Sequence, residues 1–327
     1  MTDITGIEHA ASRLKGAIRV TPLLSAPALD RIAGRRVLIK TESLQHTGSF
    51  KYRGAKAAMT APDLPAGGVL AVSSGNHAQG VARAAAEAGR SAVILMPQDA
   101  PAAKIEGTRA LGAEVVLYDR YTQDRDQMSR TMAAEWDLHL IHPYDDPQVI
   151  AGQGTVGLEL AAQAAAEGIH EADVLIPCGG GGLSSGVALA LANRAPGLRV
   201  RTVEPAGFDD TARSLAAGER LANAPDGRSL CDAILTAQPG QLTFPILSRL
   251  AGPGLVISDD QALQAMAAAF AHLRLVLEPG GAAALAAALS GMTGGTGPVI
   301  AVASGGNVDP ALFCRALTGT YTNGPKD

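Results

Sequence analysis

Aromatic residues make up only 3% of this 327-residue sequence, whereas glycine and alanine are abundant. Small side chains let helices approach one another closely, so we expect a core built on small residues and not on aromatic clusters. Hydrophobic residues still account for 47% of the chain, which is enough for a sizeable core. The length is too great for one average domain and suits two.

Cysteine is scarce, and no run of one charge sign stands out. The three cysteines are widely spaced and form no zinc pattern, which favours a reducing cytoplasm. The net charge is −4 with acids and bases interspersed, so we expect no nucleic-acid or membrane partner. The first residues lack the pattern of a signal peptide, and the longest apolar run, near 282–289, is too short to span a bilayer.

The sequence contains no repeats and no low-complexity linker, and strand-like segments alternate with helix-like ones. Such alternation predicts parallel β-sheets with crossover helices, an α/β fold. A compact smaller domain is expected over residues 50–145. Strands are expected at 37–40, 69–72, 92–96, 114–117, 172–177, 198–203, 255–257 and 299–302. Helices are expected at 4–18, 76–88, 102–111, 122–136, 154–167, 183–194, 259–275 and 282–289.

Lys51 directly follows Gly48-Ser49-Phe50 at the start of a small-residue helix. Ser49 suits a helix N-cap, which would place Lys51 in the first turn. The positive end of a helix dipole disfavours a cation there, so we expect a lowered pKa and a neutral amine that condenses with aldehydes. Phe50 offers a flat apolar face to an aromatic cofactor. A lone lysine is more often a surface charge, so the neighbouring motifs decide between the two interpretations.

A glycine run, 179–182, follows one predicted strand and opens a helix. Its successive N–H groups could surround a phosphate, with help from the helix dipole; the alternative is a tight turn. The spacing does not match the dinucleotide fingerprint, and no Gly-Lys-Ser/Thr follows. Two other strands end in polar loops, Ser73-Ser74-Gly75-Asn76-His77 and Ser304-Gly305-Gly306-Asn307, and both loops could also be simple turns or caps.

Taken in order, these motifs resemble those of fold-type II pyridoxal-phosphate enzymes, in the serine/threonine dehydratase and serine racemase branch. The resemblance runs from 21–23 to 304–307. It implies two doubly wound parallel-sheet domains of the tryptophan synthase β type. The larger, cofactor-binding domain would comprise 1–49 plus 146–327, and 50–145 would form a smaller mobile domain. It also implies pyridoxal 5'-phosphate bound covalently to Lys51 and a homodimer.

The resemblance assigns roles residue by residue. The cofactor contacts it implies are Phe50, Lys51, Asn76, Gly179, Gly180, Gly181, Gly182 and Ser304. The substrate contacts it implies are Ser73, Ser74, Asn76, His77 and Arg125. A hydroxyl such as that of Ser304 at the pyridine nitrogen would leave the ring a weaker electron sink, which favours expulsion of a β leaving group.

Ser74 and Arg125 distinguish members of this branch. Serine racemases and hydroxyaspartate dehydratases have serine at the position of Ser74, where many bacterial threonine dehydratases have alanine. A hydroxyl there could exchange a proton on the face of the substrate opposite Lys51; the alternative is a capping serine. Arg125 matches a substrate-carboxylate arginine of racemase-like relatives and could hold a carboxylate bidentately, or it is an ordinary surface charge.

Glu204, Phe208 and Asp210 lie in one short loop. Two carboxylates and an intervening backbone carbonyl suit a hard cation such as Mg²⁺ or Ca²⁺. The loop also resembles the divalent-cation loop of the serine racemase branch. An acidic loop without a cation, simply solvated, is the alternative.

We therefore expect an enzyme, with Lys51 and Ser74 as its catalytic residues. Its expected reaction is elimination from threonine, serine or 3-hydroxyaspartate, giving a 2-oxo acid and ammonia, and racemisation of serine or aspartate is the close alternative. A nucleotide-binding oxidoreductase would need the missing dinucleotide fingerprint. A non-catalytic binding module would not need a lysine of this kind.

Overall fold

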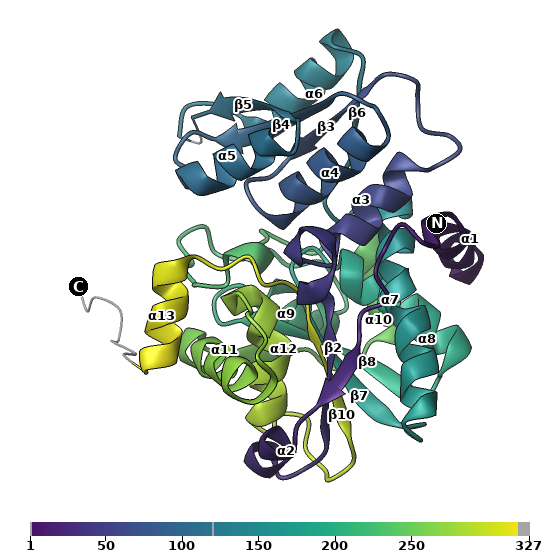
Figure 1. Ribbon diagram of the computed structural model, residues 1–327, viewed down its shortest axis with the longest axis vertical. Coiled ribbons are helices and arrows are strands. Elements are labelled where there is room, and N and C mark those ends of the chain that lie inside the picture. Colours follow the sequence, from purple (N-terminus) through teal and green to yellow (C-terminus); the bar gives the residue numbers. More distant parts are fainter. Residues whose placement is uncertain (1, 120, 320–327) are drawn as a thin grey trace.

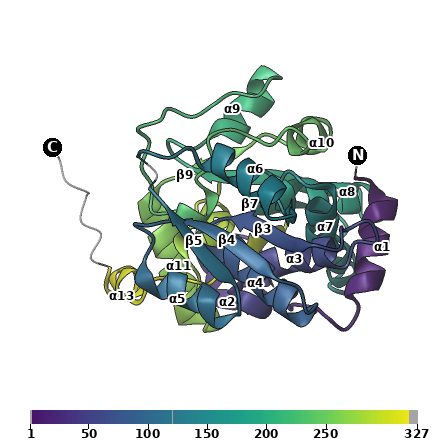
Figure 2. The same ribbon diagram turned by 90° about the horizontal axis from the view of Figure 1, so that it is seen from above.

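The computed structural model describes residues 2–119 and 121–319, which form two β-sheets with helices packed on them (Figure 1). This arrangement confirms the expected α/β class with two doubly wound sheets. Among the described residues, no helix is long and apolar enough to cross a membrane. In both views, α1 (Ile4–Leu14) and α13 (Pro310–Thr318) lie at opposite ends of the molecule (Figures 1 and 2).

The larger sheet combines strands from both ends of the chain in the order β1-β2-β10-β7-β8-β9. All neighbouring pairs are parallel except β1 with β2. The strands are β1 (Leu23–Ser25), β2 (Val37–Thr41), β7 (Ala172–Pro177), β8 (Leu198–Pro205), β9 (Leu255–Ile257) and β10 (Val299–Ala303). Successive side chains enter opposite cores, since Leu38 belongs to one buried cluster and Ile39 to another.

Two groups of helices supply the rest of those clusters. On the face of Leu38 lie α7 (Pro147–Ala166) and α8 (Gly182–Arg194). On the face of Ile39 lie α2 (Pro27–Ala33), α11 (Asp259–Leu273), α12 (Pro279–Leu289) and α13. The sheet is thus covered on both sides, as expected for near-continuous apolar parallel strands.

The smaller sheet is entirely parallel, in the order β5-β4-β3-β6. Its strands are β3 (Gly68–Val72), β4 (Ala92–Pro97), β5 (Glu114–Tyr118) and β6 (Leu138–Leu140). Its helices are α4 (Asn76–Glu87), α5 (Ala102–Ala110) and α6 (Arg125–Glu135). Alternate residues of β4 again face different cores, because Ile94 packs with α4 and α5 whereas Leu95 packs with α6.

Helix α3 (Lys51–Met59) lies between the two sheets (Figure 1) and packs against both α4 and α7. The remaining elements are α9 (Asp210–Ala217), α10 (Thr243–Leu250) and the 3₁₀ turns η1 (Glu42–Leu44), η2 (His46–Gly48) and η3 (Asp232–Ile234). The division into 1–49 plus 146–327 and 50–145 stays a prediction. The smaller sheet with its helices occupies 68–140, and α3 precedes it.

Close helix packing through small residues, expected from the composition, is confirmed between α7 and α8. A Cβ added to Gly186 would lie 2.4 Å from the carbonyl oxygen of Ile150. One added to Gly157 would lie 2.7 Å from the Cβ of Ala190. Helix α3 is held against α7 in the same way, since a Cβ on Gly54 would lie 2.3 Å from the Gln153 side chain.

A buried ionic cluster fastens α3 to the larger sheet. Arg53 is fully buried and donates through Nε and Nη2 to both carboxylate oxygens of Glu42, at 2.7 and 2.8 Å. It also donates to both oxygens of Glu159 on α7, at 2.7 and 2.9 Å. Lys40 of β2 completes the cluster with an ion pair to Glu159 at 2.5 Å. Two cations thus face two carboxylates, and we name these four residues the Arg53 cluster.

The sequence placed the start of α7 wrongly. The helix begins at Pro147, with the Asp146 side chain accepting from the N–H groups of Gln148 and Val149, whereas a start at 154 was expected. Glycines at 152 and 154 lowered the apparent helix propensity, but they are the residues that permit close packing. Short elements were also missed: β1, α2, β6, α9, α10 and α13.

Candidate active site

The predicted motifs meet at the carboxyl ends of parallel strands, the place where open α/β sheets bind ligands. Ser304 follows β10, the glycine run 179–182 follows β7, and the Ser73 loop follows β3. Figure 1 shows the smaller sheet above the larger one, with α3 between them. The sheet topology therefore gathers segments that are far apart in the sequence.

Lys51 is the first residue of α3, as expected, but Ser49 does not cap the helix. Phe50 occupies the cap position, no side chain caps it, and the Ser49 hydroxyl is buried without a partner. The Lys51 Nζ donates to the carbonyl oxygen of Pro143 at 2.7 Å and lies 5.2 Å from the centre of the Phe50 ring. Burial lowers the pKa of Lys51 to about 8. The amine is therefore partly neutral near physiological pH.

Ser304 lies directly beside Ser49 and Phe50, the two residues that precede Lys51. Its carbonyl oxygen accepts from the N–H of Phe50 at 3.1 Å, and Ser49 pairs with Gly305 in an isolated β-bridge. The Ser304 N–H donates to the carbonyl oxygen of Gly281 at 3.2 Å. Glycine is needed at that close approach, because a Cβ on Gly281 would lie 2.1 Å from the oxygen of Gly305.

The glycine run forms a cradle at the start of α8. Gly181 caps the helix with φ +90°, a conformation that favours glycine, and no side chain caps the helix N–H groups. The Tyr144 ring covers the run, since a Cβ on Gly180 would lie 2.2 Å from Tyr144 Cδ2. The buried Thr236 hydroxyl beside Gly179 has no partner. Open N–H groups and a free hydroxyl at a helix N-terminus fit a phosphate.

The Ser73 loop enters α4, and the structure contradicts the interpretation of Ser74 as a cap. Gly75 is the N-cap, no side chain caps the helix, and the Gly75 N–H donates to Ser73 Oγ at 3.2 Å. Ser74 is half-buried and leaves its hydroxyl available. His77 Nε2 lies 2.9 Å from the Ile141 carbonyl oxygen. Burial, with the nearby Lys51 charge, lowers the pKa of His77 to about 3, so its ring is neutral.

Asn76 is the residue that bridges the two sheets within the site. Its Nδ2 donates to Glu278 at 2.6 Å, and its Oδ1 accepts from Asn307 at 2.7 Å. Arg125, in contrast, lies outside this group. Its side chain is 56% exposed and pairs with its neighbour Asp126 at 3.1 Å. A role of Arg125 at the substrate therefore stays a prediction.

The acidic loop leads into α9, where Thr211 Oγ1 lies 3.6 Å from the Sγ of Cys178, the residue before the glycine run. The Glu204 carboxylate, near the end of β8, accepts from the N–H groups of Thr211 and Ala212, at 2.9 and 2.7 Å. Asp210 Oδ1 accepts from Asn223 at 2.6 Å, while its buried Oδ2 has no partner. Burial raises the pKa of Glu204 to about 8 and that of Asp210 to about 6. Among the described residues, no group of three or more His, Cys, Asp or Glu side chains is arranged so that it could hold a metal ion.

Sequence reasoning missed the residues that shape the site without carrying a motif of their own. Tyr144 over the glycines and the Pro143 carbonyl at Lys51 both follow His142, whose Nδ1 accepts from the N–H of Asp145 at 2.9 Å. The signal available in the sequence was Pro143 between the rings of His142 and Tyr144, shortly after the strand β6. Asn307 was within a recognised motif but had no expected contact.

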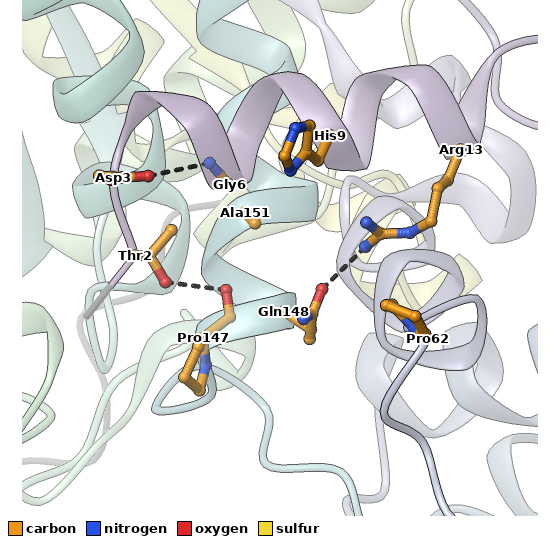
Figure 3. Close-up of a pocket in the computed structure, with 9 residues that line it drawn as sticks. All are labelled: Thr2, Asp3, Gly6, His9, Arg13, Pro62, Pro147, Gln148 and Ala151. Carbon is orange, nitrogen blue, oxygen red and sulfur yellow. Dashed lines mark hydrogen bonds between the residues drawn. The ribbon is translucent and has the colours of Figure 1, made fainter.

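A separate cavity of about 270 Å³ lies between α1, the start of α7 and Pro62 (Figure 3). Arg13 and His9 point towards it from α1, and Arg13 donates to Gln148 at 2.8 Å. None of its lining residues belongs to the motifs around Lys51. It is therefore distinct from the site at the strand ends.

Comparisons with known proteins agree with the geometry. A family model described as "Pyridoxal-phosphate dependent enzyme" matches residues 14–305. An L-threo-3-hydroxyaspartate ammonia-lyase of Pseudomonas sp. is 40% identical, over 95% of this chain and 97% of the relative.

Two solved structures extend this likeness to the fold. A threonine deaminase from T.th. has a TM-score of 0.88 and 43% identity, covering 94% of this chain and 99% of its own. Maize serine racemase has a TM-score of 0.89 and 34% identity, covering 97% of each chain. The similar proteins thus include both ammonia-lyases and racemases.

Proposed function

Because this chain belongs to the pyridoxal-phosphate-dependent enzyme family, we propose that it eliminates the β-hydroxyl of a hydroxy amino acid. The products are a 2-oxo acid and ammonia. The observation that carries this proposal is the half-buried, readily deprotonated Lys51 at Pro143, whose neighbour Tyr144 covers the glycine run at the uncapped start of α8. The likeness to a hydroxyaspartate ammonia-lyase and a threonine deaminase supports it.

The residues present fit the cofactor. Lys51 would hold pyridoxal phosphate covalently, Gly179 to Gly182 would hold its phosphate, and Ser304 and Asn76 would contact its ring. Phe50 lies against the Lys51 amine and offers an apolar wall. When bound, pyridoxal phosphate supplies an electron sink for the electrons left at the substrate Cα.

The protein's own groups account for the proton movements. Once the substrate amine has replaced it, neutral Lys51 takes the Cα proton, and the resulting ammonium can return that proton to the β-hydroxyl, which leaves as water. A water molecule then hydrolyses the carbon–nitrogen bond of the dehydrated product, which releases ammonia and the 2-oxo acid. One water leaves and one enters, so the net reaction needs no oxidant or reductant. Ser73, Ser74 and the start of α4 would receive the substrate carboxylate.

The substrate we propose is threonine, serine or 3-hydroxyaspartate. A panel of these amino acids, assayed for ammonia release and for the enantiomer recovered, tests the proposal. Ammonia from none of them would contradict it. An assembly as a homodimer in the cytoplasm is part of the same proposal, and sedimentation of the purified protein tests the dimer.

Racemisation of serine or aspartate is the second candidate function, and the free Ser74 hydroxyl favours it. Lys51 reaches one face of the substrate, so the opposite face needs a proton carrier of its own. We expect Ser74→Ala to abolish racemisation while elimination from the preferred enantiomer falls by less than about tenfold. The measurement compares enantiomeric excess with 2-oxo acid formation. Equal loss of both activities would show that Ser74 only shapes the loop.

A divalent cation at Glu204, Phe208 and Asp210 is a further part of the proposal. The free Asp210 Oδ2 and the buried acidic pair support it, and water molecules would complete the ligand set. We expect chelation to lower the unfolding temperature and Mg²⁺ or Ca²⁺ to restore it. Asp210→Asn should remove that response, whereas Asp226→Asn, a control in the following loop, should keep it. Unchanged metal content in Asp210→Asn would disprove the site.

A further inference from the structure

A chain of hydrogen bonds crosses from one sheet region to the other beside Lys51. Glu278, at the start of α12, accepts from Asn76 Nδ2 at 2.6 Å. Asn307 Nδ2 donates to Asn76 Oδ1 at 2.7 Å and to the carbonyl oxygen of Thr47 at 2.8 Å. Asn76 opens α4 of the smaller sheet, whereas Glu278 and Asn307 belong to segments of the larger one.

These hydrogen bonds permit only one orientation of the Asn76 amide. An ionised carboxylate accepts hydrogen bonds and cannot donate, so the Nδ2 group must face Glu278. The Asn307 amide nitrogen only donates, so the Oδ1 must face Asn307. A flipped Asn76 would set oxygen against carboxylate and nitrogen against nitrogen. The second N–H of Asn76 Nδ2 therefore keeps a fixed direction.

The surroundings keep Glu278 in place for this contact. The side chain is 4% exposed, and its backbone N–H donates to the carbonyl oxygen of Gly305 at 3.2 Å. A Cβ on Gly305 would lie 2.0 Å from Glu278 Oε1 and 3.1 Å from Asn76 Nδ2. Glycine at 305 thus makes room for the carboxylate and for its bond to Asn76.

Burial and the neighbouring charges bring the pKa of Glu278 close to neutral pH. Burial raises the pKa of Glu278 to about 7, and the charge of Asp232 on η3 acts in the same direction. Lys104 on α5 and the Asn76 hydrogen bond act in the opposite direction. Lys104 and Asp232 form an ion pair at 2.8 Å, and the neighbouring Cys231 thiol is itself held protonated by burial, which raises its pKa.

We propose that Glu278 is a positioning residue whose carboxylate fixes the Asn76 amide, so that its remaining N–H meets an oxygen of the cofactor held at Lys51. This role rests on the proposed function. A protonated Glu278 could donate as well as accept, and the flipped amide would then recover a hydrogen bond. With Glu278 protonated, only Asn307 disfavours the flipped amide, so both ends of Asn76 are fixed only when Glu278 is ionised.

Equilibrium binding of pyridoxal phosphate to cofactor-free protein tests the role. At pH 8 we expect Glu278→Gln to bind roughly tenfold more weakly than the wild type, because a neutral amide oxygen accepts from Asn76 Nδ2 less strongly than a carboxylate and the glutamine can itself flip. The ratio of the two affinities should fall to about one below pH 6, where wild-type Glu278 is also neutral. Because the ratio is used, titration of the ligand itself cancels.

Further variants define the source of the effect. Asn76→Ala should bind as weakly as the double variant with Glu278→Gln, since the two residues act through one contact. Asp232→Asn should keep the pH-dependent step and move it to lower pH, because a neighbouring negative charge is removed. If Glu278→Gln does not fold, Glu278→Asp keeps the charge but withdraws it from Asn76 and should also bind weakly at pH 8.

An affinity of Glu278→Gln equal to that of the wild type at pH 8 would overturn the role, as would additive losses in the double variant. Those results would leave the proposed function intact if the wild type binds tightly. A wild-type protein that binds no pyridoxal phosphate at any pH would contradict the proposed function and this role with it.

Discussion

Replacing Lys51 by alanine is expected to lower kcat for elimination by at least about a thousandfold, within the range for loss of a general base. The purified wild-type protein should be yellow, and borohydride should fix pyridoxal phosphate to Lys51. The variant should lose this fixation while keeping its fold. The reason is that the half-buried amine donates to the Pro143 carbonyl at 2.7 Å and has its pKa lowered by desolvation to about 8.

Lys56→Ala provides the matched control, because Lys56 lies on the same helix and pairs with Glu87 at 2.8 Å. We expect its kcat to stay within about twofold, as for a lysine outside the chemistry. In cofactor-free protein, acylation of Lys51 should speed up about tenfold per pH unit up to its pKa and level off above it, since only the neutral amine reacts. An alanine variant within tenfold of wild-type activity would refute the assignment.

Arg53→Met is expected to destabilise the protein by about 3–5 kcal/mol, the usual result of removing one partner from a buried ionic group. The change leaves Glu42 and Glu159 buried or nearly so, without the guanidinium that binds both. Although burial disfavours the charged form of Glu42, the Arg53 charge keeps its pKa below the usual range. Urea unfolding followed by circular dichroism measures the loss.

Two further substitutions separate charge from geometry. Arg53→Lys keeps the charge but cannot form the fork that contacts both carboxylates, so it should recover only part of the stability. Arg36→Met removes an exposed ion pair with Glu167, whose side chains are 44% and 47% exposed, and should cost less than about 1 kcal/mol. Equal losses for Arg53→Met and Arg36→Met would show that the Arg53 cluster contributes no more than a surface pair.

The fold class followed from local alternation of strand and helix patterns, because buried parallel strands such as β4 are uniformly apolar. The failures share a physical cause. Helix α7 carries glycines that local propensity penalises and that only its neighbours α3 and α8 explain. Strand β1 has three residues and pairs in antiparallel fashion with β2, a contact that no local pattern announces.

The site was predictable where a motif carries its own chemistry, as at Lys51 and the glycine run. It was not predictable where a residue acts through a distant partner. Glu278 acts in this way, since its bond to Asn76 joins positions 202 residues apart. Ser49 was expected as a cap because serine favours caps, but the backbone bridge to Gly305 occupies that segment instead.

The place of β10 in the larger sheet has a consequence for biosynthesis. β10 (Val299–Ala303) lies between β2 and β7, whereas the smaller sheet uses only strands from 68 to 140. A ribosome adds roughly 5–20 residues per second, so the smaller sheet can pair while most of the chain is still unmade. Strands β2 and β7 must wait with open edges until residue 303 emerges, and open strand edges promote aggregation. Misassembly through these edges is therefore possible until β10 has been made, and Ser304 takes its place beside Phe50 only then.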